Sequence, residues 1–112
     1  MAAEGRTIDA LGIAERERVL RVLRAHEIEL RARGVARLRL FGSMARGEAR
    51  PDSDVDLIAD IDPNVSFSLV DLFGLQEFLS EILGRQVDIG TTVAKLRPRL
   101  RQRFEAEVIE VF

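Results

Sequence analysis

The feature that most constrains this fold is a Gly-Ser pair that ten residues separate from an Asp-x-Asp pattern. An apolar run ends at Phe41, and Gly42 and Ser43 follow it directly. Glycine suits a place where the backbone turns sharply and approaches a ligand closely, because it has no side chain. The serine hydroxyl and its backbone N–H lie at the expected start of a helical turn, where a phosphate fits. The pattern predicts a strand, a phosphate-binding turn and a second strand.

Two aspartates, Asp54 and Asp56, open the second predicted strand. Side chains two positions apart on a strand leave the same face, so both carboxylates can share divalent cations. In two-metal phosphoryl transfer, carboxylates bridge the cations, a cradle holds the triphosphate and an acceptor oxygen lies in line. A phosphate cradle beside paired carboxylates therefore favours metal-dependent phosphoryl or nucleotidyl transfer.

A third carboxylate should come from an adjacent strand, and the candidates are Asp60, Asp62 and Asp88. Asp60 shares the face of Asp56, but four residues of strand separate the two by about 13 Å. That distance is too long for one metal, and Asp62 is farther still. Asp88 stands alone in an apolar strand, where an isolated carboxylate needs a partner or a metal. We therefore predict Asp54, Asp56 and Asp88 as catalytic metal ligands, with Asp88 as the candidate general base.

Arg46 lies in the turn after Ser43, and the sequence leaves two roles open for it. Its guanidinium either reaches the phosphates of a bound nucleotide or braces the turn by pairing with Glu48 or Asp52. We predict a nucleotide-binding set of Gly42, Ser43 and Arg46. Other arginines could line a basic patch beside the site, although an ordinary polar helix face is favoured for most of them. These arginines are Arg85, Arg97, Arg99, Arg101 and Arg103.

Hydrophobic periodicity predicts alternating helices and strands. On the first strand the alternation places Val35 on one face with Arg37 and Arg39. The helix that ends at residue 83 is broadly apolar and should be well buried. The predicted elements are a helix over 13–33, a strand over 35–41, a helical turn over 43–50, a strand over 54–61, a helix capped by Ser66 or Ser68, a strand over 86–89, a helix starting at 97 and a strand over 108–112.

Composition excludes several classes of function. The chain has 112 residues, no cysteine and one histidine, which excludes disulfides, thiol catalysis and His-rich metal sites. His26 is expected to be an ordinary surface or boundary residue. A net charge of −2 gives no basic footprint, so no direct nucleic-acid contact is expected. Without a long apolar run or a signal-peptide profile, we expect no membrane contact and a cytoplasmic location. Residues 1–12 should be flexible, and residues 13–112 should form one domain.

The complete Gly-Ser-x10-Asp-x-Asp motif resembles the signature of the polymerase-beta-type nucleotidyltransferase superfamily. The fuller run from Phe41 to Leu57 is similar to that of the minimal nucleotidyltransferase (MNT) proteins, and the later Val87-Asp88-Ile89 fits as well. The resemblance covers roughly residues 15–112. It implies an α/β (α+β) fold of the polymerase-beta-like type, in which a small mixed sheet carries helices on one face and the site on the other.

The resemblance also implies site residues and chemistry. Asp54, Asp56 and Asp88 would hold Mg²⁺, and Gly42 and Ser43 would bind the phosphates of ATP. MNT proteins are commonly antitoxins that neutralise a partner HEPN ribonuclease toxin by transferring AMP onto a tyrosine of the toxin. The resemblance thus implies a protein adenylyltransferase with ATP as substrate. This sequence has no tyrosine, so a tyrosine target would lie on another chain.

Two alternatives to this function remain. The chain could be a binding-only antitoxin that blocks its toxin sterically and keeps an idle site. It could also be an adenylyltransferase that acts on a small hydroxylated compound, although a chain of 112 residues leaves little room for a separate acceptor domain.

Overall fold

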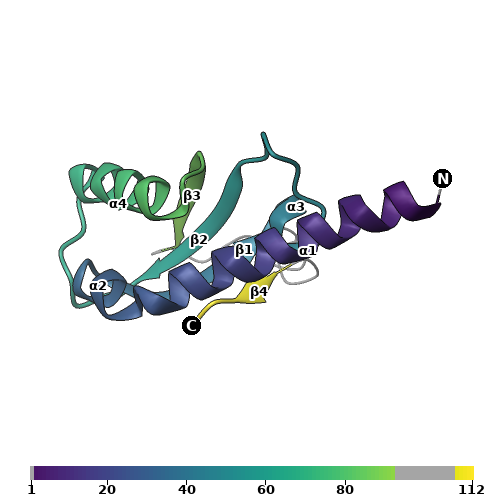
Figure 1. Cartoon of the computed structure of the whole chain (residues 1–112). Coiled ribbons are helices and arrows are strands. Elements are labelled where there is room, and N and C mark those ends of the chain that lie inside the picture. Colours follow the sequence, from purple (N-terminus) through teal and green to yellow (C-terminus); the bar gives the residue numbers. More distant parts are fainter. Residues whose placement is uncertain (1, 93–107) are drawn as a thin grey trace.

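A computed structural model describes residues 2–92 and 108–112 of the chain (Figure 1). Within these ranges helices and strands alternate much as the periodicity predicts. The predicted helix starting at 97 lies outside the described residues, as do the four arginines at positions 97–103. The elements are α1 (Ala2–Ala25), α2 (Glu27–Ala32), β1 (Val35–Phe41), α3 (Gly42–Ala45), β2 (Val55–Ile61), α4 (Leu69–Leu83), β3 (Val87–Thr92) and β4 (Ile109–Glu110).

The strands form one mixed sheet of four, in the order β3-β2-β1-β4. Strand β1 is antiparallel to both of its neighbours, whereas β2 and β3 run parallel. A parallel pair needs a crossover connection, and α4 supplies it. Side chains of α1 and α4 share one core with the buried residues of the strands, so these helices cover one face of the sheet. The predicted mixed sheet with helices on one face is confirmed.

Strand β2 shows why the two faces differ. Val55, Leu57 and Ala59 are fully buried, and they form the predicted inward row of alternating apolar residues. Asp56 and Asp60 lie on the opposite face, on either side of the buried Ile58, and are only half-buried. Alternation along one strand therefore separates the hydrophobic core from a face that carries carboxylates.

The predicted faces of β1 are wrong at Val35. This residue is 1% exposed and belongs to the core, although the alternation placed it with the arginines. Val35 pairs with Ile61 and Arg37 pairs with Asp60, so Ala36 is an extra residue that the partner strand does not match. Such a bulge shifts the alternation by one position and turns Val35 inward.

The single helix predicted over residues 13–33 is also wrong. The structure has two helices, since α1 begins at Ala2 and ends at Ala25, before α2. His26 separates them with φ −103° and ψ 17°, away from helical values. Its Nδ1 lies 2.8 Å from the carbonyl oxygen of Val22, and its ring meets Phe78 edge-on at 5.9 Å. His26 is therefore a half-buried boundary residue, as expected. The flexibility of residues 1–12 stays a prediction.

Helix α4 has clear signals at both ends. The Ser68 hydroxyl accepts a hydrogen bond from the backbone N–H of Asp71, and the Asp71 carboxylate accepts one from the N–H of Ser68. This reciprocal capping box fixes the start of the helix at the second of the two predicted serines. Gly84 ends the helix in the left-handed conformation, with φ +65°.

The predicted thorough burial of α4 is wrong. Its buried residues recur every fourth position, at Leu75, Leu79 and Leu83. This stripe is the fully buried face of the helix, Leu72, Phe78 and Ile82 pack against the core only in part, and the remaining apolar side chains lie in solvent. The exposed apolar side chains of α4 are Leu69 (64%), Val70 (77%) and Phe73 (60%).

No helix in the described part of the chain has the length and apolar character needed to cross a membrane.

Candidate active site

Neighbouring elements bring the predicted site residues to one edge of the sheet. Asp54 precedes β2, Asp56 is the second residue of β2, and Asp88 is the second residue of β3. Asp56 and Asp88 are Cα partners in the parallel pairing, and Phe41 is the partner of Asp56 on the antiparallel side. Because Gly42 follows Phe41 directly, the Gly-Ser turn and the aspartates meet at this edge.

The contact between Gly42 and Asp56 is close enough to require glycine. Gly42 has φ +76°, a conformation that residues with a side chain rarely adopt. A Cβ atom at position 42 would lie 2.6 Å from Oδ2 of Asp56, which is closer than real contacts allow. The turn closes through hydrogen bonds from the N–H of Arg46 to the carbonyl of Gly42 (3.2 Å) and from Glu48 to Ser43 (2.9 Å).

The three aspartates form a cluster of like charge. Asp54 and Asp88 are exposed and Asp56 is half-buried. Burial raises the pKa of Asp56, and the charges of Asp88 and then Asp54 raise it further. Within the described ranges, no hydrogen bond or ion pair joins these carboxylates to another residue. We call this group of three the acidic edge.

The chemistry of the acidic edge fits a magnesium ion. Mg²⁺ prefers carboxylate oxygens, and a cation would relieve the repulsion that Asp56 experiences. The side chains are not yet gathered as ligands, because among the described residues no three acidic, cysteine or histidine groups are placed to hold one ion. The backbone places the three aspartates as neighbours, and their assignment as metal ligands stays a prediction.

The two aspartates excluded on distance have structural partners. A carboxylate oxygen of Asp60 lies 3.1 Å from a guanidinium nitrogen of Arg39, which shares its face of the sheet. The Asp62 side chain accepts a hydrogen bond of 2.9 Å from the backbone N–H of Asn64, at the turn after β2. Both carboxylates therefore serve local structure at a distance from the acidic edge.

Arg46 adopts one of the two roles that the sequence left open. Its Nε lies 3.1 Å from a carboxylate oxygen of Glu48, so it braces the turn in this structure. The guanidinium is exposed, and exposed ion pairs of this kind contribute little free energy. Nucleotide binding by Arg46 therefore stays a prediction.

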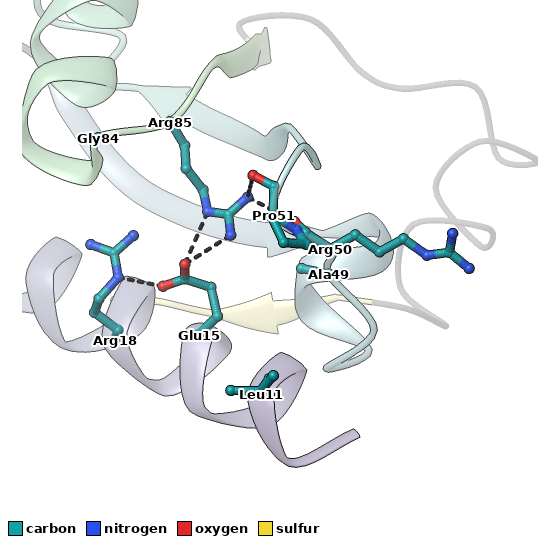
Figure 2. Close-up of a pocket in the computed structure, with 8 residues that line it drawn as sticks. All are labelled: Leu11, Glu15, Arg18, Ala49, Arg50, Pro51, Gly84 and Arg85. Atoms are coloured by element: carbon teal, nitrogen blue, oxygen red, sulfur yellow. Dashed lines mark hydrogen bonds and ion pairs between the residues drawn. The ribbon is translucent and has the colours of Figure 1, made fainter. Parts of the chain in front are cut away.

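Sequence reasoning missed the role of Arg85, which is not part of an exposed patch. Its side chain is 11% exposed and holds the loop before Asp54. Nη1 donates to the backbone carbonyls of Arg50 (3.0 Å), Pro51 (3.3 Å) and Ser53 (2.8 Å). Figure 2 shows the Arg50 side chain pointing away from Arg85, so only its backbone takes part. No local pattern predicts these contacts, because they join residues more than thirty positions apart.

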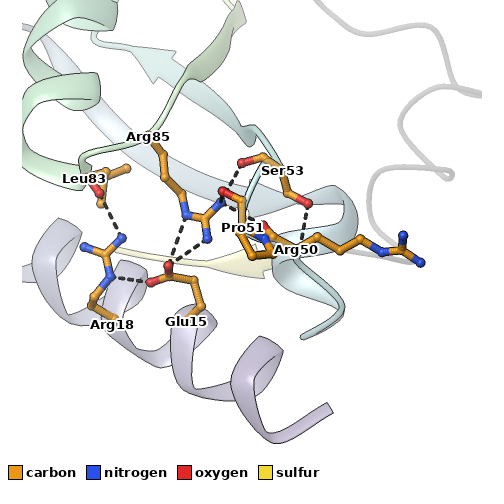
Figure 3. A network of polar contacts seen from close by, with 7 residues as sticks. All are labelled: Glu15, Arg18, Arg50, Pro51, Ser53, Leu83 and Arg85. Carbon is orange, nitrogen blue, oxygen red and sulfur yellow. Dashed lines mark hydrogen bonds and ion pairs between the residues drawn. The ribbon is translucent and has the colours of Figure 1, made fainter. Parts of the chain in front are cut away.

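The same guanidinium also binds α1 (Figure 3). Its Nε and Nη2 donate to one carboxylate oxygen of Glu15, at 3.1 and 2.8 Å. Arg18 pairs with the other oxygen of Glu15 and donates a hydrogen bond of 2.9 Å to the carbonyl of Leu83. The hydrogen bond from Arg18, ahead of those from Arg85, holds the pKa of Glu15 below its ordinary value despite partial burial. We call Glu15, Arg18 and Arg85 the arginine clasp.

A cavity of about 740 Å³ lies beside the clasp, between α1 and the loop before β2. None of the predicted site residues lines it, so this cavity is separate from the acidic edge. Its lining residues are Leu11, Glu15, Arg18, Ala49, Arg50, Pro51, Gly84 and Arg85 (Figure 2).

Comparison with known proteins gives concordant matches. Residues 23–111 match the family model described as "Nucleotidyltransferase domain". The protein adenylyltransferase MntA of Thermococcus cleftensis is 43% identical over 74 residues, which cover 65% of this chain and 73% of that protein. A solved structure described as a candidate minimal nucleotidyltransferase is 40% identical, with a TM-score of 0.60, over 86% of this chain and 88% of that one.

A more distant match shows the fold alone. A chain from the structure of a tri-AMPylated HEPN toxin of Shewanella oneidensis in complex with its MNT antitoxin superposes with a TM-score of 0.57. It is 17% identical, and the match covers 83% of this chain and 71% of that one. The predicted resemblance to minimal nucleotidyltransferases is confirmed by these matches.

Proposed function

This chain belongs to the nucleotidyltransferase domain family, and from that premise we propose that it is the antitoxin of a toxin–antitoxin pair. It transfers AMP from ATP, with Mg²⁺, onto a tyrosine of a partner HEPN ribonuclease toxin. The observation that carries the proposal is the position of Asp56, which pairs with Asp88 across the sheet and lies against Gly42. The residues proposed to bind phosphate and those proposed to bind metal are therefore neighbours.

Each residue of the site has a proposed task. Asp54, Asp56 and Asp88 would hold Mg²⁺, which when bound neutralises charge on the phosphates. Gly42 admits the nucleotide because it has no side chain, and Ser43 offers a hydroxyl and an N–H to the phosphates.

In the proposed reaction, this chain also accepts the proton of the acceptor hydroxyl. The acceptor oxygen forms a bond to the α-phosphorus of ATP as the bond to pyrophosphate breaks. The proton of the acceptor hydroxyl goes to Asp88, which is exposed and therefore within reach of a second protein. Arg46, also exposed at this edge, would leave Glu48 to pair with the phosphates.

Similar proteins support the choice of acceptor. The relative from Thermococcus cleftensis is named a protein adenylyltransferase, and the MNT antitoxin with this fold was solved with an AMPylated HEPN toxin. The sequence has no tyrosine of its own to modify. Together these observations favour another protein over a small compound as the acceptor. A cytoplasmic location stays a prediction.

Mass spectrometry of the partner HEPN toxin tests the proposal. After the toxin is incubated with this chain, ATP and Mg²⁺, it should gain AMP on a tyrosine and lose ribonuclease activity. The double variant Asp54→Asn/Asp56→Asn should do neither, whereas Asp60→Asn serves as a matched control on the same strand and should act as wild type. If the double variant still neutralises the toxin without adding AMP, the chain is a binding-only antitoxin and the proposal is wrong.

A further inference from the structure

We propose that Arg85 is a positioning residue for Asp54, and this inference rests on the proposed function. Asp54 lies outside the sheet, because β2 begins at Val55. Its carboxylate must nevertheless be held beside that of Asp56 if both are to serve one metal site. The contacts of Arg85 with the loop before Asp54 supply that constraint.

Both peptide groups that flank Asp54 are fixed from the same short segment. The carbonyl of Ser53 belongs to the planar peptide group that contains the nitrogen of Asp54, and Nη1 of Arg85 binds it at 2.8 Å. The next peptide group carries the N–H of Val55, which donates to the carbonyl of Gln86 at 2.9 Å. Consecutive residues, 85 and 86, thus set the backbone on either side of Asp54.

The loop before Asp54 is held in a tight turn by the same group. Nη1 of Arg85 also reaches the carbonyls of Arg50 and Pro51. Within the loop, the Ser53 hydroxyl accepts a hydrogen bond of 2.8 Å from the N–H of Arg50. One nitrogen therefore gathers the carbonyls of residues 50, 51 and 53 toward a single point, and this convergence determines where the chain enters Asp54.

Only arginine can make this set of contacts. A guanidinium has five N–H donors in a rigid plane, so it can serve the loop carbonyls through Nη1 and Glu15 through Nε and Nη2. A lysine ammonium is a single point charge and would have to choose between the loop and Glu15. Arg85 touches none of the acidic edge residues, so its effect on Asp54 passes through the backbone.

The same segment leads to the acidic edge on β3. Two residues separate Arg85 from Asp88, and Asp88 is the Cα partner of Asp56. Arg85 therefore ties the loop before Asp54 to the start of the segment that carries Asp88.

Direct metal binding tests the inference without relying on catalysis. Mn²⁺, a paramagnetic substitute for Mg²⁺, loses its free-ion electron paramagnetic resonance signal when a protein binds it. Arg85→Lys should weaken Mn²⁺ binding by about 10-fold to 100-fold, as loss of an outer-shell contact does at metal sites. In AMP transfer kcat should fall by a similar factor, while KM for ATP stays within about two-fold because Arg85 does not touch the Gly42–Ser43 turn.

Two matched variants separate positioning from stability. Arg18→Lys alters the same Glu15 pairing but touches no loop carbonyl, so Mn²⁺ affinity should stay within about three-fold of wild type. Glu15→Gln removes the negative charge that pairs with Arg85 but leaves the contacts of Arg85 with the loop carbonyls. This variant should also bind Mn²⁺ within about three-fold of the wild-type affinity. Thermal unfolding of all variants shows how much each change destabilises the fold.

Every result decides the inference. Wild-type Mn²⁺ affinity in Arg85→Lys, or an equal loss in Arg18→Lys or Glu15→Gln, would overturn it. The inference would also be overturned if Arg85→Lys failed to fold while Arg18→Lys folded, because Arg85 would then stabilise the whole fold and not the position of Asp54 in particular. Failure of the proposed function looks different, since wild-type chain would bind Mn²⁺ and ATP yet transfer no AMP to the toxin.

Discussion

The acidic edge and the arginine clasp treat their carboxylates in opposite ways. At the acidic edge, Asp56 lies between Asp54 and Asp88, and its pKa is raised. In the clasp, Glu15 lies between two arginines, and its pKa is lowered. Both groups are partly buried, so burial alone does not explain the difference. Burial raises the pKa of Asp56, and the negative charges of Asp88 and Asp54 add to that rise, whereas at Glu15 the hydrogen bonds and charges of Arg18 and Arg85 outweigh the effect of burial.

This contrast separates a carboxylate that the fold stabilises in its charged form from one that the fold destabilises in that form. A carboxylate with a lowered pKa is stabilised by its own chain, as in structural ion pairs. A carboxylate with a raised pKa is held in a place that the folded chain itself disfavours, which is common at functional sites. If the acidic edge binds a cation as proposed, that binding would restore the stability that the repulsion removes.

Removing a carboxylate from the acidic edge should have the largest effect. In Asp54→Asn or Asp56→Asn, AMP transfer should fall on the order of 100-fold or more, because a metal ligand stabilises transition-state charge by several kcal/mol. Transfer of labelled AMP from ATP to the toxin measures the rate. Asp60→Asn breaks a structural pair with Arg39 and should transfer AMP at the wild-type rate. If this variant lost as much activity as Asp56→Asn, the carboxylates of the acidic edge would not differ in function from a structural carboxylate.

Adding one methyl group at Gly42 should have the second largest effect. Gly42→Ala should destabilise the fold by about 1–2 kcal/mol from its left-handed backbone, and the clash with Asp56 should lower AMP transfer by about ten-fold or more. Urea unfolding and initial rates measure the two effects.

Gly84→Ala is the control for backbone strain. Gly84 has φ +65°, similar to Gly42, but an added Cβ would meet nothing within 4 Å. This variant should lose a similar amount of stability and keep its activity. A loss of activity at position 84 would mean that backbone strain, and not contact with Asp56, explains the result at position 42.

The raised pKa of Asp56 predicts a smaller effect on stability. The protonated form is favoured in the folded state, so this contribution to stability is full below the ordinary pKa of 3.8 and is lost as pH rises through the raised value. Without metal at neutral pH, Asp56→Asn should therefore melt at a higher temperature than wild type. The gain should vanish below pH 3.8, and calorimetry across that range would detect it.

Magnesium should reverse that difference. Adding Mg²⁺ should raise the melting temperature of wild type more than that of Asp56→Asn, because only wild type has the full set of carboxylates. Equal shifts in both proteins would show that Asp56 does not contribute to binding.

The smallest effect is expected in the clasp, with the opposite dependence on pH. The lowered pKa of Glu15 gives stability that is present above its ordinary value of 4.5 and lost as pH falls through the folded value. Glu15→Gln should cost on the order of 1 kcal/mol or less at neutral pH, since solvent screens a partly exposed pair. The difference in unfolding free energy between this variant and wild type should shrink in acid. A difference that stays constant with pH would show that the variant loses packing and not a charge interaction.

Local patterns in the sequence predicted the parts of the site that strand geometry controls. Alternation along β2 placed Asp56 opposite the core, and the isolated Asp88 on β3 pairs with it as a neighbouring-strand carboxylate should. The requirement for glycine at position 42 followed from the turn, although its contact partner, Asp56, did not.

Features that depend on distant residues were not predictable in this way. The bulge at Ala36 reverses the face of Val35, and nothing in the local alternation marks it. The apolar character of α4 does not reveal that only one stripe is fully buried. Arg85 follows a helix-ending glycine, and its contacts with Glu15 and Ser53 exist only after α1, α4 and the loop before β2 have packed.

The parallel pairing of β2 and β3 has a consequence for the order of folding. The connection between the antiparallel neighbours β1 and β2 contains only α3 and one loop, whereas Asp56 and Asp88 meet only after the longer crossover through α4. Contacts between residues far apart in sequence form slowly, because the intervening chain must first be ordered. We therefore expect this pairing to be among the last to form, so that a nascent or partly folded chain cannot consume nucleotide before its tertiary structure is complete.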